Sequence, residues 1–125
     1  MKQTFKIPGA PAPIGPYSPA VLKNDTLYVS GQIPTNPKTG ELTLDTIESS
    51  TKQIMDNIGL LLNEAGMNYS NIVKVTIFLT NLDDFVAVNG VYGSYFKIDP
   101  PARETVQVSR LPMNVPIEIS CIAVK

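Results

Sequence analysis

The residue best suited to holding a planar anion is Arg103. A guanidinium can bind both oxygens of a carboxylate at once, and the chain offers only one other arginine, Arg110. Arg103 follows a Pro-Pro-Ala turn, at the mouth of an expected strand. Taken alone, an arginine at such a place is more often a solvated charge, paired here with Asp99 or Glu104. Arg103 is therefore a candidate anion-binding residue, with the surface alternative left open.

Glu118 is the candidate for moving a proton. It lies within the most apolar predicted strand, on the same side as Ser120 and Ile122. A carboxylate is rarely buried unless it is paired or takes part in chemistry. The structural alternatives are an edge-strand position that faces water and an ion pair with Arg110.

Three further places carry groups that could line a site, and each has a plainer interpretation. Tyr17 could donate its hydroxyl to a ligand, although a tyrosine in a proline-rich loop is more commonly a packing residue. Ser30 and Gly31 end a predicted strand, where a turn glycine is the default. Asn89 lies beside the apolar stripe of a predicted helix, where most amides tie a helix to a loop.

The composition excludes several mechanisms. The chain has no histidine and a single cysteine, Cys121, so neither a Ser-His-Asp triad nor a Cys-His pair can form. Cys121 has no base or cation evident beside it and is expected to be a small core residue. Zinc would need a cluster of carboxylates, which the sequence lacks, so no metal or other cofactor is expected.

Length and charge define the class of protein. The 125 residues suit one domain spanning 1–125, and 43% apolar residues can form a core. A net charge of −1 without a run of Lys or Arg argues against nucleic-acid binding. No apolar stretch is long enough to cross a membrane, and the first residues lack the apolar region of a signal peptide. A lone cysteine suits a reducing compartment, so a cytoplasmic protein is expected.

The hydrophobic pattern predicts strands and helices in the order βββαβαββ. Asn24-Asp25 is a two-residue hairpin signal, and Gly66 can end a helix capped by Asp45 or Thr46. The proline-rich residues 8–19 form a fixed loop that carries Tyr17. The predicted elements are a short strand near residue 5, strands at 20–23 and 26–30, a helix at about 46–65, a strand at 72–80, a helix at about 84–96, and strands at 105–109 and 116–124.

This order implies an uncovered sheet face. Two helices can cover only one face of a six-stranded sheet, yet the strand at 72–80 has apolar residues on both faces. Val73, Val75, Ile77 and Leu79 are assigned to one face, and Ile72 and Phe78 to the other. An exposed apolar face marks an interaction surface, so an oligomer is expected.

Several short motifs occur together in one order, and together they resemble the RidA (YjgF) family of reactive intermediate deaminases. The resemblance covers the chain from about residue 5 to its end. It implies an α+β fold like the trimeric type of chorismate mutase: a six-stranded sheet, two helices on one face, and a homotrimer with ligand sites between subunits. The motifs are Gly-Pro-Tyr-Ser-Pro-Ala-Val (15–21), Tyr-Val-Ser-Gly-Gln-Ile (28–33), Val-Asn-Gly-Val-Tyr (88–92), Pro-Ala-Arg-Glu-Thr-Val-Gln-Val (101–108), Leu-Pro (111–112) and Ile-Glu-Ile (117–119).

The resemblance also implies a function. Family members hydrolyse 2-aminoacrylate and related enamines or imines (2-iminobutanoate, 2-iminopropanoate), which Ser/Thr dehydratases release, to 2-keto acids and ammonia, without a cofactor. Arg103 matches the arginine that grips the substrate carboxylate, and Glu118 matches the acid near the attacking water. The positions that match the lining of the cleft are Tyr17, Ser30, Gly31, Asn89 and Thr105.

Two positions depart from the family pattern. Thr105 stands where many members have cysteine, and Glu104 stands where many have serine. Glu104 adds a negative charge beside Arg103, although alternation along a strand should point it to the opposite face.

Two other functions stay open: a regulatory trimer that binds a 2-keto acid without turnover, and an endoribonuclease or translation inhibitor, which the missing histidines and acidic balance disfavour.

Overall fold

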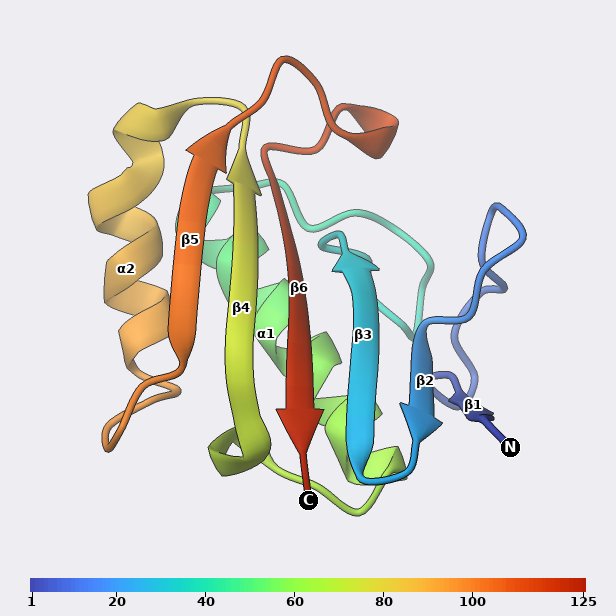
Figure 1. Cartoon of the computed structure of the whole chain (residues 1–125). Coiled ribbons are helices and arrows are strands. Elements are labelled where there is room, and N and C mark those ends of the chain that lie inside the picture. The colour runs from blue at the N-terminus through green and yellow to red at the C-terminus, as the bar shows by residue number, and fades with distance from the viewer.

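The computed structural model describes all 125 residues as one six-stranded sheet with both helices on one face (Figure 1). The strand order is β1-β2-β3-β6-β4-β5, and only β4 and β5 run parallel. The α+β fold and the order βββαβαββ are therefore confirmed. The elements are β1 (Gln3–Phe5), β2 (Ala20–Lys23), β3 (Thr26–Gln32), α1 (Ile47–Glu64), β4 (Ile72–Leu79), α2 (Phe85–Gly93), β5 (Ala102–Gln107) and β6 (Ile117–Val124).

Helix α1 forms the core with the central strands. Thr46 caps it through a capping box with Ser49, and Gly66 follows its end with a φ of 72°. Its apolar stripe packs on β3 and β6, so that Ile54 and Ile119 are completely buried. Neither helix is long and apolar enough to cross a membrane.

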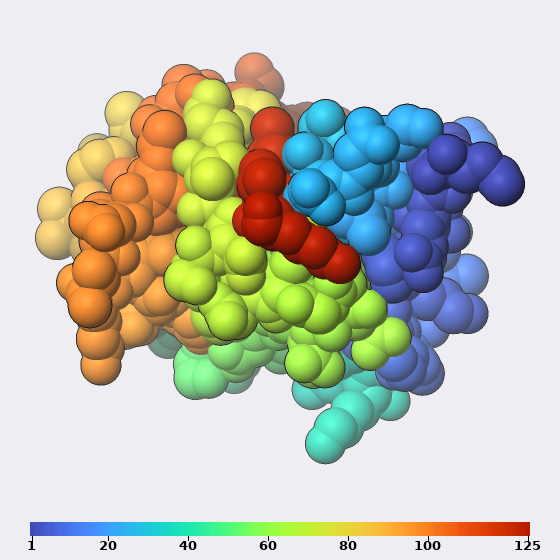
Figure 2. All heavy atoms as spheres, turned by 60° about the horizontal axis from the view of Figure 1, so that its bottom comes forward, coloured from blue at the N-terminus to red at the C-terminus, as the bar shows by residue number.

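The C-terminal residues pack between neighbouring segments at one end of the sheet (Figure 2). The last residues lie between the β2–β3 turn and the segment that follows α1. The Lys125 amide donates to the Asp25 carbonyl over 2.9 Å, and the Asn71 side chain donates to the Val124 carbonyl over 3.0 Å. These contacts anchor β6, the strand that carries Glu118.

The predicted assignment of side chains to sheet faces was wrong for the first two residues of β4, Ile72 and Val73. The pairing of β4 with β6 shifts by one residue between Ile72 and Lys74, so Val73 is an extra residue in a β-bulge. Ile72 is consequently buried, whereas Val73 is exposed. Beyond the bulge, Val75 and Ile77 face the helices as expected, and Phe78 lies on the uncovered face.

Strand β5 begins three residues earlier than predicted. It pairs in parallel with β4 from Lys74↔Ala102 to Leu79↔Gln107, because β4 offers a full-length edge to pair with. Arg103 therefore lies within the strand and not at its beginning.

Helix α2 is shorter than predicted. A 3₁₀ turn at Leu82–Asp84, capped by Asn81, precedes the helix, and the helix ends at Gly93.

Candidate functional site

One cleft, of about 590 Å³, lies between the proline-rich segment, the end of β3 and the loop before β6. Its lining is largely apolar, with Ile14 and Met113 among the lining residues, and Glu118 is its one carboxylate. We call it the carboxylate cleft. Four of the predicted site residues line it: Tyr17, Ser30, Gly31 and Glu118.

Glu118 points into the cleft because of its place in β6. Its neighbours Ile117 and Ile119 are buried against the helices, so strand alternation turns Glu118 to the uncovered face. Burial raises the pKa of its carboxyl group above the usual value. Arg110 contacts Asn114 over 3.2 Å, so the expected alternative of a Glu118–Arg110 ion pair is wrong.

Gly31 provides the space that Glu118 occupies. The pairing of β3 with β6 shifts between Val29 and Gln32, which places a β-bulge at Ser30 and Gly31. A Cβ atom on Gly31 would lie 2.5 Å from Glu118 Oε2. The glycine is therefore needed for close approach, and the expectation of a simple turn glycine was incomplete.

Ser30 fastens the mouth of the cleft, and Tyr17 lines it. The Ser30 hydroxyl donates to the Ser18 carbonyl over 2.7 Å, and the Ser30 amide donates to the Pro19 carbonyl over 2.9 Å. These bonds fasten the proline-rich segment to β3. Tyr17 is about half exposed at the cleft, where its hydroxyl is free to meet a ligand.

The remaining predicted residues, called the arginine group here, lie outside this cleft, Asn89 on α2 and Arg103 and Thr105 on β5. Arg103 pairs with Val75 of β4 and faces α2, where its Cζ lies 4.8 Å from the ring centroid of Tyr92. Thr105, two residues further along β5, has a buried hydroxyl without a hydrogen-bond partner. Asn89 lies half-buried on α2.

Arg103 has no acidic partner. The two ion pairs of the structure join Lys52 to Asp56 and Lys74 to Glu104. Glu104 also accepts a hydrogen bond from Thr76, and these contacts hold the pKa of its carboxyl below the usual value. The expected alternative, an Arg103–Glu104 pair, is therefore wrong, because the two side chains point to opposite faces of β5.

The carboxylate cleft and the arginine group do not meet within one chain. Arg103 lies on the helix side of the edge strand β5, whereas Glu118 lies on the uncovered side of the central strand β6. The resemblance implies that both groups line sites between subunits, and within one subunit they lie on opposite faces of the sheet.

Sequence reasoning missed two aromatic contacts of Arg103. Phe85 and Tyr92 of the predicted second helix were not among the candidate site residues, yet both rings lie beside the guanidinium. Their spacing of seven residues could have indicated a shared helix face. Burial raises the pKa of Tyr92 to about 12, against the lowering effect of Arg103, so the hydroxyl stays protonated.

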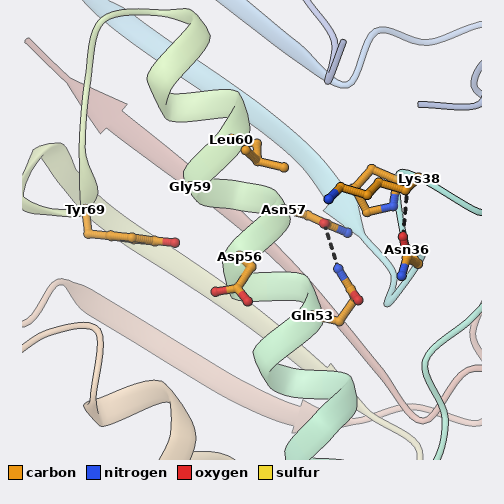
Figure 3. A pocket seen from close by; sticks show the side chains of 9 residues that line it. Asn36, Lys38, Gln53, Asp56, Asn57, Gly59, Leu60 and Tyr69 are labelled. Carbon is orange, nitrogen blue, oxygen red and sulfur yellow. Dashed lines mark hydrogen bonds between the residues drawn. The ribbon is translucent and has the colours of Figure 1, made fainter. Parts of the chain in front are cut away.

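Cys121 and the residues around a second hollow are weaker candidates for a functional site. Burial raises the pKa of the Cys121 thiol to about 12, which agrees with its expected role as a core residue. The hollow, of about 520 Å³, lies beside α1, and Figure 3 shows Gln53, Asn57 and Asp56 around it. Its amides and carboxylate bond to neighbouring residues of the same chain. No group of three or more His, Cys, Asp or Glu residues is placed to hold a metal ion.

Comparison with known proteins relates the chain to one protein family. The model of the family described as Endoribonuclease L-PSP matches residues 8–125. Reactive intermediate deaminase A of Arabidopsis thaliana is 43% identical over 122 residues, which are 98% of this chain and 65% of that protein.

Two solved structures share the whole fold. A Yersinia pestis protein of the conserved Rid family has a TM-score of 0.95 at 46% identity, with 100% of both chains covered. E. coli TdcF with bound serine has a TM-score of 0.92 at 36% identity, with 98% of both chains covered.

Proposed function

The chain belongs to the endoribonuclease L-PSP family, also called the RidA or YjgF family, and from this we propose that it is a hydrolytic deaminase. Its proposed substrates are 2-aminoacrylate, 2-iminobutanoate and 2-iminopropanoate, which it converts to 2-keto acids and ammonia. The observation that carries the proposal is Arg103, a half-buried guanidinium with no acidic partner. A planar carboxylate is the anion that such a group binds best.

The chemistry needs little more than orientation. Imines hydrolyse in water, so a fixed carbon and one positioned water can supply most of the acceleration. Glu118 takes a proton from the attacking water and returns it to the departing nitrogen. The raised pKa of Glu118 brings its carboxyl closer to neutral pH, where both proton transfers are possible. Hydrolysis by this route uses no metal or organic cofactor.

A homotrimer would join the two halves of the site. The uncovered sheet face carries exposed apolar residues, including Tyr28 and Val106, which a second copy can bury. In the proposed assembly, the arginine group of one subunit completes the carboxylate cleft of the next. The serine bound to the related TdcF supports a small amino-acid-like ligand for this fold.

Sedimentation equilibrium should give the mass of a trimer at micromolar concentration. Ile122 lies half-buried on the uncovered face, so Ile122→Lys should shift the protein towards monomer by placing a charge in the interface. Leu60→Lys is the matched control, because Leu60 is a partly exposed apolar residue on α1. A wild-type monomer would contradict the assembly, and equal masses for all three proteins would place the interface elsewhere.

Gly31→Ala should lower turnover roughly 10- to 100-fold, because the new methyl group displaces the Glu118 carboxylate and catalysis depends steeply on position. The measurement is decay of imine absorbance after a coupled Ser/Thr dehydratase. Gly90→Ala is the control, because a Cβ at Gly90 would meet no atom within 4 Å apart from its chain neighbours and the backbone of its own helix. Equal activity of both variants would show that Glu118 need not occupy its present position.

The same coupled assay separates the alternative functions. A regulatory trimer would bind 2-keto acids without accelerating imine decay. An endoribonuclease, the activity in the family's description, would cleave RNA in a parallel reaction. The cytoplasmic location stays a prediction, which fractionation of the cell would test.

A further inference from the structure

The guanidinium of Arg103 lies beside two aromatic rings of α2. Its Cζ is 4.8 Å from the centroid of Tyr92 and 5.5 Å from the centroid of Phe85. Both distances fall within the range of a cation–π interaction. With no carboxylate beside it, the cation is held by aromatic faces, which leaves its N–H groups available to an anion.

The local structure accounts for this arrangement. Phe85 and Tyr92 are seven residues apart, so they lie on the same side of α2, about 10 Å apart along the axis. Helix α2 runs alongside the edge strand β5 (Figure 1), and the parallel register fixes Arg103 opposite Val75. The side chain of Arg103 therefore reaches the stretch of α2 between the two rings.

We propose that Phe85 and Tyr92 are positioning residues, which orient the plane of the Arg103 guanidinium before the substrate carboxylate arrives. This inference rests on the proposed function, because it assigns a role within the same anion site. A flexible arginine would lose side-chain freedom on binding, and an arginine already held by two rings loses less. The rings act through Arg103 and do not contact the reacting atoms.

The two rings differ in how cleanly they can be tested. Phe85 is partly exposed, so Phe85→Leu should leave the fold intact. Tyr92 is buried, and Tyr92→Leu could disturb packing. Tyr92→Phe keeps the ring face and removes only a hydroxyl that has no partner, so it should rescue what Tyr92→Leu loses.

The first test needs no substrate. The chain has only two arginines, so a ¹H–¹⁵N spectrum of the arginine Nε groups contains two signals, and Arg110 serves as the internal reference. Ring currents should shift the Arg103 signal upfield in the wild type, and Phe85→Leu should move it towards the Arg110 position. An Arg103 signal unchanged by Phe85→Leu and Tyr92→Leu would overturn the proposal.

The second test uses the coupled imine assay. Phe85→Leu should raise KM about two- to fivefold, with a smaller change in kcat, while Val86→Ala on the same helix changes neither. In an Arg103→Gln background, Phe85→Leu should have no further effect. A loss that persists in this background would overturn the positioning role. A wild type without deaminase activity would refute the proposed function instead, and the spectrum would still decide whether the rings hold Arg103.

Discussion

Arg103→Lys is expected to lose most of the deaminase activity although the positive charge is kept. Lysine offers one point charge on a flexible stem, whereas the guanidinium fixes both carboxylate oxygens and with them the plane of the imine. The loss of one charge-assisted contact should cost about 1.5–3 kcal/mol of binding free energy, which is roughly 10- to 150-fold. Misorientation of the reacting carbon should lower kcat in addition.

The stability of this variant should change little. Arg103 is only half-buried and has no ion pair to break, so its replacement leaves no unpaired carboxylate. The measurements are dehydratase-coupled turnover and the thermal melting temperature. Arg110→Lys is the control, because Arg110 is exposed and its side chain makes one hydrogen bond, to Asn114. Near-normal turnover of Arg103→Lys, or equal losses in both variants, would mean that another group holds the carboxylate.

Glu118→Gln should retain the fold and the binding of a 2-keto acid while turnover falls roughly 100-fold or more. The amide has nearly the same shape as the carboxylate but cannot exchange a proton, and general acid–base catalysis typically contributes about 10²–10⁴-fold. Binding should survive because Arg103, and not Glu118, holds the carboxylate of the ligand.

The pH dependence of turnover gives a second test of proton transfer by Glu118. Burial raises its carboxyl pKa, so the fraction able to accept a proton from water grows as pH rises through that raised value. The rate of the wild type should therefore fall on acidification, at a higher pH than an exposed glutamate would require, and the Glu118→Gln profile should lack this fall. Glu64→Gln, which changes an exposed carboxylate at the end of α1, should keep the wild-type profile. An unchanged rate in Glu118→Gln would remove Glu118 from the mechanism.

Local patterns in the sequence were sufficient to predict most of the elements. The Asn24-Asp25 turn, the Thr46 cap and the positive φ of Gly66 each act within a few residues, so their effects can be read from neighbours along the chain. The alternation of β6 likewise assigned Glu118 to the side opposite Ile117 and Ile119 correctly. The resemblance of the motifs then indicated the family, which the comparisons confirm.

The errors lay where distant segments determine the outcome. The beginning of β5 depends on how far β4 extends beside it, and the exposure of Val73 depends on a bulge against β6. Neither partner lies near in sequence, so propensity and periodicity could not reveal these pairings.

The sequence by itself determined which side chains can do chemistry: one candidate arginine, one carboxylate in an apolar strand, and no histidine. Only the tertiary structure decided where these side chains lie. The sheet order puts β5 at the edge and β6 near the centre, so Arg103 meets the rings of α2 while Glu118 meets Gly31 on the other face. The physical reason is that a sheet has two faces, and the pairing of distant strands, together with the side that the helices cover, assigns each side chain to one of them.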